Sequence, residues 1–259
     1  ADMDFINSRT ESYESFKEQL LNLDVDKMSE ISGVPKNLAR DAAIAYASAG
    51  NAMSFHGLGV TEQSQGTFTV IQIADLAMIT GNIGKKGAGV NPLRGQNNVQ
   101  EAADMGAQPH QGAGYLDVTD PEMNSRYNTF YKREVPSHVG YKIPEMFDAA
   151  IAGDLKALWI IGEDVVQTDP NTQKVIKALE NTEMVIVQEL FMTETAKYAD
   201  VVLPATSFAE KNGTFTNTER RVQRVRKAID APGEAMDDWW IASQIARRLG
   251  AKGFEYGST

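Results

Sequence analysis

The 259-residue sequence contains no cysteine. Disulfide bonds, thiolate nucleophiles, cysteine-ligated zinc and iron–sulfur ligation are therefore excluded for these residues. Histidine is scarce as well: His56, His110 and His138 lie far apart in the sequence and form no HExxH motif or comparably close pair. We therefore expect no metal site built from the side chains of this chain.

Long apolar runs are also absent. No segment reaches the roughly 18 apolar residues of a membrane-spanning helix, and the opening ADMDFINSRTESYESF lacks the basic and apolar regions of a signal peptide. We expect a cytoplasmic protein without a membrane span. A net charge of −10 at pH 7 disfavours binding of nucleic acid or anionic lipid through the whole surface.

The composition is that of a globular protein. A hydrophobic content of 42% and a charged content of 23% can fill a core, so intrinsic disorder and coiled coil are poor interpretations. The length suits one large domain or two ordinary ones, since a domain usually has about 100–200 residues.

Helical and strand patterns alternate along much of the chain. Apolar spacing predicts helices over 11–24, 35–48, 67–80, 146–152, 172–179 and 237–249. Short apolar runs predict strands over 51–56, 157–161, 184–187 and 201–203. Short buried strands separated by helices are typical of parallel sheets. We expect an α/β fold with parallel, Rossmann-like sheets and helices on both faces.

Two segments depart from this alternation. Residues 81–144 are rich in glycine and amides without an apolar period, which predicts an irregular binding loop or a flexible one. Asn212-Gly213 is a strong turn pair and predicts a β-hairpin near 212–226. That hairpin carries a basic run, which we interpret as a solvated strand face or a subunit contact: Arg220, Arg221, Arg224, Arg226 and Lys227.

The glycine-rich stretch contains neither a G-x-G-x-x-G directly after a strand nor a GxxxxGK[ST] motif, so a standard dinucleotide fingerprint or P-loop is excluded. Lys85, Lys86 and Arg94 nevertheless stand among glycines and amides, a set of donors that suits an anionic ligand. The Arg94 guanidinium offers a fork for a carboxylate or phosphate. The alternatives are a solvated loop and a surface ion pair.

Polar residues follow two successive predicted strands. Gly162, Glu163 and Asp164 come after the strand at 157–161, and Gln188 and Glu189 follow the next. Ligands of doubly wound sheets bind beyond the carboxyl ends of strands, where a carboxylate can accept from ribose hydroxyls or guanine N–H groups. This favours nucleotide binding over the alternatives of a helix cap or a solvated turn.

A family resemblance is carried by the segments GLGVTEQSQGT, NPLRGQNNVQEAADMGAQP, IIGEDVVQTDP, VIVQELFMTETAKYADVVLPATSFAEKNGTFTNTERRVQ and DDWWIASQIARRLG. From about Pro35 to Gly250 the sequence resembles the molybdopterin oxidoreductases of the dimethyl-sulfoxide-reductase type, most closely the catalytic (alpha) subunits of formate dehydrogenases. The resemblance implies oxidation of formate to CO₂ with bis-molybdopterin guanine dinucleotide that carries molybdenum or tungsten.

The resemblance also implies roles for individual residues. Arg94 matches the arginine that orients formate beside the metal, and Gln96 matches a pterin contact. Leu58 and Glu62 fall on the loop for the other pterin, although Glu62 and Ala205 differ from the amide and hydroxyl of some relatives. Matches to guanine-nucleotide contacts are Gly162, Glu163, Asp164, Thr168, Gln188, Glu189 and Asp238.

Three family domains are implied. Residues 1–94 would be part of a pterin-binding domain with a substrate loop at 81–100. Residues 95–207 would form a second α/β domain that binds a guanine-nucleotide tail, and residues 208–259 would contribute a hairpin and a helix to a third, incomplete domain.

Several family parts have no counterpart in this sequence. These are the cysteine cluster of a 4Fe–4S centre, its relay lysine, the cysteine or selenocysteine on the metal with its following histidine, and the C-terminal domain. We therefore expect an internal fragment that is inactive alone, binds no cofactor or only part of one, and can self-associate. Its partners would be the remaining domains and an electron-transfer subunit or domain. The alternatives are a non-catalytic nucleotide-binding or docking module and an oxidoreductase for another substrate such as nitrate.

Overall fold

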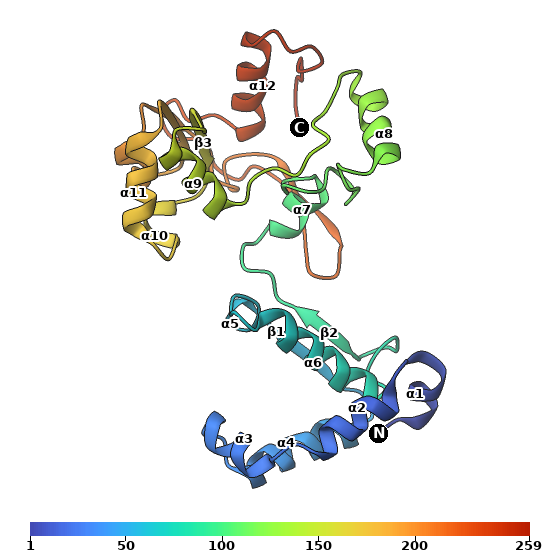
Figure 1. The fold of residues 1–259 in the computed structure, drawn as a ribbon. Coiled ribbons are helices and arrows are strands. Elements are labelled where there is room, and N and C mark those ends of the chain that lie inside the picture. The colour runs from blue at the N-terminus through green and yellow to red at the C-terminus, as the bar shows by residue number, and fades with distance from the viewer. The chain divides into compact units, whose positions relative to one another are not determined.

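The computed structural model describes all 259 residues, which form two compact units, residues 1–97 and 98–259. Figure 1 shows the elements of each unit. The division lies close to the predicted boundary after residue 94, and residues 208–259 share a unit with residues 98–207. The assignment of these units to three family domains stays a prediction. None of the helices combines the length and apolar character needed to cross a membrane.

The first unit contains a two-stranded parallel sheet with helices before and between its strands. The helices are α1 (Met3–Arg9), α2 (Tyr13–Leu21), α3 (Val25–Ser32), α4 (Lys36–Ser48), α5 (Leu58–Thr61) and α6 (Gly66–Ile79), and the strands are β1 (Met53–His56) and β2 (Gly89–Pro92). Parallel pairing of His56 with Pro92 brings the carboxyl ends of both strands together. The buried Asn82 side chain accepts from the Ala52 N–H at 2.9 Å and so ties the chain after α6 to the start of β1.

The second unit contains a three-stranded parallel sheet in the order β3-β4-β5 and an antiparallel hairpin, β6–β7. The strands are β3 (Ala157–Ile161), β4 (Met184–Glu189), β5 (Val201–Pro204), β6 (Gly213–Thr216) and β7 (Val222–Val225). The helices are α7 (Val99–Asp104), α8 (Pro121–Tyr131), α9 (Ile143–Ala152), α10 (Val165–Thr168), α11 (Thr172–Asn181), the 3₁₀ helix η1 (Thr195–Tyr198) and α12 (Asp238–Arg248).

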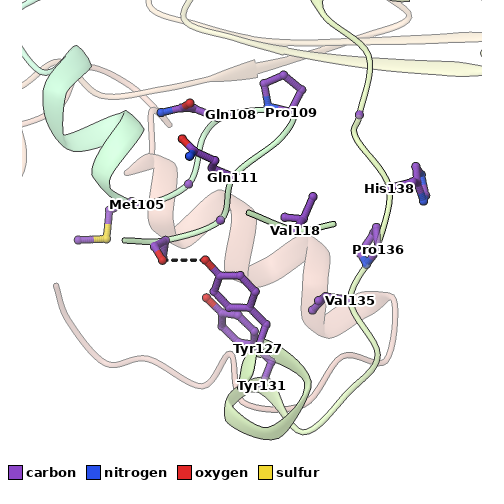
Figure 2. Close-up of a pocket in the computed structure, with 14 residues that line it drawn as sticks. Met105, Gln108, Pro109, Gln111, Val118, Tyr127, Tyr131, Val135, Pro136 and His138 are labelled. Carbon is purple, nitrogen blue, oxygen red and sulfur yellow. Dashed lines mark hydrogen bonds between the residues drawn. The ribbon is translucent and has the colours of Figure 1, made fainter. Parts of the chain in front are cut away.

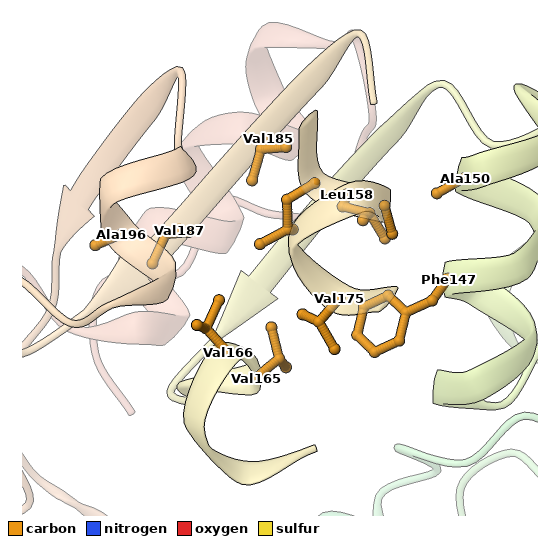
Figure 3. Packing of buried hydrophobic residues seen from close by; sticks show 11 residues of the cluster. Phe147, Ala150, Leu158, Val165, Val166, Val175, Val185, Val187 and Ala196 are labelled. Atoms are coloured by element: carbon orange, nitrogen blue, oxygen red, sulfur yellow. The ribbon is translucent and has the colours of Figure 1, made fainter. Parts of the chain in front are cut away.

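One face of the three-stranded sheet forms the main core. Side chains alternate along a strand, so Val185 and Val187 of β4 point to the same face. There they belong to a buried cluster with Phe147 of α9 and with Val175 and Leu179 of α11 (Figure 3). Continuous burial of these apolar side chains supplies the main stabilisation of the sheet.

The opposite face of the sheet is covered less completely. Trp159 and Ile161 of β3 are 37% and 52% exposed. Gln188 of β4 lies on this face by alternation and is only 1% exposed, because it contacts Asp238 at the start of α12. A polar contact thus replaces apolar cover at the carboxyl end of the central strand.

The α/β class with parallel sheets is confirmed, and each predicted helix and strand is present. The prediction that residues 81–144 are irregular throughout is wrong, because β2, α7 and α8 lie within them. The short, glycine-flanked β2 owes its strand conformation to distant pairing with β1, which leaves no local pattern. In α8 the missed signal is local: Asp120 caps the helix by accepting from the Glu122 and Met123 N–H groups.

The hairpin near 212–226 is confirmed, but its turn is not at Asn212-Gly213. Gly213 begins β6 and pairs with Val225, so the turn lies over 217–221. There the Asn217 side chain accepts from the Arg221 N–H at 3.0 Å, and Arg220 has a left-handed φ of 61°. A side-chain hydrogen bond of this kind lets asparagine close a turn without glycine.

Replacing Leu179 by alanine tests the core. Leu179 is 2% exposed within the cluster, so Leu179→Ala should lower the free energy of unfolding by about 2–5 kcal/mol. All three tryptophans lie in residues 98–259, so their fluorescence during urea denaturation reports this unit. The matched control is Leu249→Ala, at a position 82% exposed, where a change beyond about 0.5 kcal/mol would contradict the assignment of the core.

Candidate functional site

The carboxyl ends of β3 and β4 form one edge of the three-stranded sheet. Ile161 is paired with Gln188, and the Gly162 N–H donates to the Gln188 carbonyl at 2.9 Å. Gly162 then turns the chain away with a φ of +63°, a conformation that glycine adopts without a Cβ clash. The segment after β3 and the end of β4 therefore meet at this edge.

The Gln188 amide is buried at this edge with only one of its polar atoms paired. Its Nε2 donates to Asp238 Oδ1 at 2.7 Å, whereas its Oε1 is buried without a hydrogen-bond partner. An ionised carboxylate only accepts hydrogen bonds, so the amide nitrogen has to face Asp238 and the oxygen is left over. An unpaired buried acceptor costs about 1–3 kcal/mol.

Lys211 completes this group and was missed by sequence reasoning. Its Nζ forms an ion pair with Asp238 Oδ2 and donates to the Thr206 carbonyl at 2.9 Å. The Lys211 side chain is 24% exposed and the Asp238 side chain 38%, so the pair borders solvent. No local signal marks Lys211, because its partner comes from α12, far along the chain.

Asp164 is held by hydrogen bonds within its own unit. Its Oδ1 accepts from the Thr195 N–H at 2.9 Å and from the Thr195 hydroxyl at 2.6 Å, and its Oδ2 accepts from Gln167 at 2.7 Å. Burial acts to raise the pKa of Asp164, but hydrogen bonds from Thr195, from the Glu194 backbone and from Gln167 together outweigh it and lower the pKa below the ordinary 3.8. Asp164 therefore joins α10 to η1.

The other predicted residues of this edge form hydrogen bonds with residues close to them in the sequence. Glu163 Oε1 accepts from the Thr168 hydroxyl at 2.5 Å, and Glu189 Oε1 accepts from the Leu190 N–H at 2.6 Å. Burial, together with the negative charge of Glu163, raises the pKa of nearby Asp169. The structure thus brings Gly162, Gln188 and Asp238 to one edge, with Glu163 on the adjoining loop and Thr168 at the end of α10.

The first unit has its own strand-end group. Leu58 follows β1 and Arg94 follows β2, and the Leu93 N–H donates to the His56 carbonyl at 2.7 Å. A Cβ at Gly95 would lie 2.9 Å from Leu58 Cδ1, so this glycine makes room for the leucine. The predicted residues here all have exposed side chains: Leu58, Glu62, Arg94 and Gln96.

Arg94 belongs to none of the ion pairs of the structure, so its guanidinium is available to an anion. At the same strand end His56 is 7% exposed, and its Nδ1 is buried without a partner. The histidines have no metal-ligand spacing in the sequence, so sequence reasoning missed this ring. No group of three or more histidine or acidic side chains could hold a metal ion.

A separate cavity of about 410 Å³ lies in the second unit (Figure 2). The Tyr127 hydroxyl at its wall donates to the Ala113 carbonyl at 2.8 Å. The lining contains none of the residues predicted for the site; it consists of Met105, Gly106, Gln108, Pro109, Gln111, Gly112, Ala113, Val118, Tyr127, Tyr131, Val135, Pro136, His138 and Gly140. With no carboxylate, lysine or arginine, it offers less chemistry than the strand ends.

Comparisons with known proteins identify the family of this sequence. Residues 10–248 match the molybdopterin oxidoreductase family. The F420-dependent formate dehydrogenase subunit alpha of Methanocaldococcus jannaschii is 47% identical over 249 residues, which are 96% of this chain and 37% of that protein. Formate dehydrogenase H of Escherichia coli is 44% identical over 250 residues, 96% of this chain and 35% of that protein. The chain thus spans little more than a third of the length of these relatives.

A solved structure supports the fold. Acetylene hydratase from Pelobacter acetylenicus matches with a TM-score of 0.70 over 98% of this chain and 38% of that enzyme, at 18% sequence identity. A likeness at this identity concerns the fold alone.

Two carboxylates with opposite pKa shifts test the electrostatics of the edge. The ionised form of Asp164 stabilises the fold above pH 3.8, and this contribution is lost as the pH falls through its lowered pKa. Asp164→Asn should therefore cost about 1–3 kcal/mol of unfolding free energy at pH 7 and less below pH 3.8.

The matched control is Asp169→Asn. Because the pKa of Asp169 is raised, its contribution is present at low pH and lost as the pH rises through that value. Asp169→Asn should not destabilise the protein at pH 7, in urea denaturation followed by tryptophan fluorescence. Equal losses for both variants would contradict the proposed environments.

Proposed function

Because the chain belongs to the molybdopterin oxidoreductase family, we propose that it is the cofactor-holding and formate-orienting part of a molybdenum- or tungsten-dependent formate dehydrogenase. The observation that carries this proposal is the pairing of Gln188 with Asp238 at the carboxyl edge of the sheet. The identities of 47% and 44% to formate dehydrogenases support the choice of substrate.

The polar groups of the second unit suit the guanine-nucleotide tail of bis-molybdopterin guanine dinucleotide. Guanine presents N–H donors on one edge, and the strand end offers the half-exposed Asp238 carboxylate with the unpaired Gln188 oxygen behind it. Gly162 and Glu163 of the adjoining loop and Thr168 at the end of α10 would hold the nucleotide, and Glu189 would be a further contact. Asp164 would act by fixing that loop.

In the first unit, Leu58, Glu62 and Gln96 would contact a pterin. The unpaired, buried Nδ1 of His56 at the same strand end fits a ligand that is rich in hydrogen-bonding heteroatoms. The molybdopterin, when bound, supplies the metal that accepts the two electrons released as formate becomes CO₂ and a proton. The chain has no cysteine, so the ligands of that metal and of a 4Fe–4S cluster would come from other parts of the enzyme.

Arg94 would bind the substrate. Formate is a small carboxylate, and an unpaired guanidinium at a strand end can hold both of its oxygens in one plane. Holding the oxygens fixes the direction of the C–H bond, which lowers the barrier by orientation. A docking module without catalysis would have no need for a free arginine at this position.

Nucleotide titration tests the cofactor proposal on the chain itself. GMP should bind, and Asp238→Ala should weaken its binding at least about tenfold, since hydrogen bonds to a charged acceptor are lost. Isothermal titration calorimetry gives both affinities. The matched control is Asp230→Ala, which removes an exposed carboxylate from the same unit and should leave the affinity unchanged. If the chain and the Asp238→Ala variant bound GMP with equal affinity, the proposed role of Asp238 in the site would be wrong.

Formate kinetics test Arg94 in the complete holoenzyme. Arg94→Lys keeps the charge but loses the two-pronged geometry, so kcat/KM for formate should fall by about 10²–10³, as when an enzyme loses one preorganised donor. Arg126→Lys in α8 is the control and should retain the parent rate. A turnover by Arg94→Lys close to that of the parent would contradict the proposed role.

A further inference from the structure

The cavity of the second unit has no role in the function proposed above. Residues of 105–118, of α8 and of 135–140 line it. Its volume of about 410 Å³ falls within the roughly 300–1,000 Å³ that small-molecule sites occupy. The lining contains no aspartate, glutamate, lysine or arginine, so a charged ligand would find no partner of opposite charge there. The cavity therefore suits a small, neutral molecule.

Hydrogen bonds tie the three segments around the cavity together. The Asn124 side chain in α8 donates to the Val118 carbonyl at 3.2 Å and to the Pro136 carbonyl at 3.1 Å. The Gly140 N–H donates to the Pro109 carbonyl at 2.7 Å. Because each segment is bonded to another, the cavity exists before a ligand enters, and little ordering of the walls opposes binding.

Two tyrosine rings lie at one side of the cavity (Figure 2). The rings of Tyr127 and Tyr131 are stacked, with centroids 6.1 Å apart and an angle of 20° between them. The hydroxyl of Tyr127 is held by the Ala113 carbonyl, and a Cβ at Gly112 would lie 2.6 Å from the Tyr127 ring, so the glycine leaves room for it. Tyr131 is 48% exposed, which opens the stack to a ligand from solvent. Such rings favour an aromatic partner, stacked or edge to face.

Two glutamines, Gln108 and Gln111, lie at the opposite side of the cavity (Figure 2). Gln111 Nε2 donates to the Tyr115 carbonyl at 3.2 Å. A carbonyl oxygen only accepts, so the amide nitrogen faces Tyr115 and Gln111 Oε1 remains as an acceptor without a partner. This side of the cavity therefore favours a ligand that donates a hydrogen bond.

We propose that this cavity binds a neutral, planar heteroaromatic molecule that carries a ring N–H. The aromatic ring packs against Tyr127 and Tyr131, and the N–H donates to Gln111 Oε1. The inference goes beyond the proposed formate chemistry and does not depend on it.

Three bicyclic compounds serve as probes of the complete enzyme: indole, benzofuran and indole-5-carboxylate. Benzofuran has the shape of indole with an oxygen in place of the N–H, and indole-5-carboxylate adds a negative charge. Indole should bind about five times more tightly than benzofuran, the effect of one hydrogen bond. It should also bind more tightly than its carboxylate, because the lining has no cation. Titrations followed by ligand-detected nuclear magnetic resonance give the three dissociation constants.

Val118→Phe tests whether the probes bind in this cavity. The added ring takes up space that the ligand would fill, so the affinity for indole should fall at least about tenfold. The matched control is Val222→Phe, at a position 64% exposed on the hairpin, which should leave the affinity unchanged.

Gln111→Leu tests the hydrogen bond. Without the amide oxygen, indole and benzofuran should bind about equally, whereas the affinity for benzofuran should change little. Gln223→Leu, at an exposed position of β7, is the control and should keep the preference for indole.

The possible failures have different meanings. If the complete enzyme binds none of the probes, another part of the polypeptide fills the cavity, and the inference is overturned. Unchanged indole binding by Val118→Phe, or equal affinities of the unsubstituted enzyme for indole and benzofuran, would also overturn it; each of these results leaves the formate dehydrogenase proposal in place. If Val118→Phe fails to fold, as judged by circular dichroism, Val135→Phe replaces it, with the same expected and overturning results.

Discussion

The hydrogen bond between Gln188 and Asp238 joins the central strand of the parallel sheet to the start of α12, and the site in residues 98–259 depends on it. It requires a buried amide at a position that apolar side chains usually occupy. This hydrogen bond pairs the amide nitrogen of Gln188, whereas the amide oxygen stays buried without a partner. A fold selected for stability alone would favour an apolar side chain here, so the unpaired amide oxygen supports the proposed ligand site.

The parts of the fold that could be predicted are those with dense local patterns. β3, β4 and β5 contain apolar runs, and α11 has the helical spacing of Val175 and Leu179, because all of these elements contribute to one core. The short β2 could not be found in this way, since its conformation depends on pairing with β1. The turn of the hairpin was predicted at Asn212-Gly213, because that pair is the stronger turn signal in the sequence. The actual turn is closed by a hydrogen bond to the Asn217 side chain, which the sequence pattern does not reveal.

The candidate site likewise has parts that the sequence reveals and parts that depend on distant contacts. Polar residues after apolar strands were recognisable, but the sequence does not distinguish a carboxylate that braces a loop from one that faces a ligand. Asp164 accepts hydrogen bonds from Thr195 and Gln167, whereas Asp238 contacts Gln188 of the central strand and Lys211. That difference, like the contribution of Lys211, arises from contacts between segments far apart in the sequence.

Each of the two strand-end groups contains a cation, Arg94 in the first unit and Lys211 in the second. The chain carries a net charge of −10, yet the ligands proposed for its strand ends are anionic. Local cations therefore have to offset a repulsive field: Arg94 stands unpaired for a small anion, and Lys211 neutralises the carboxylate that the nucleotide would meet. Arg94 could be recognised from its sequence context, whereas Lys211 could be recognised only from the fold, because its partner Asp238 is distant in the sequence.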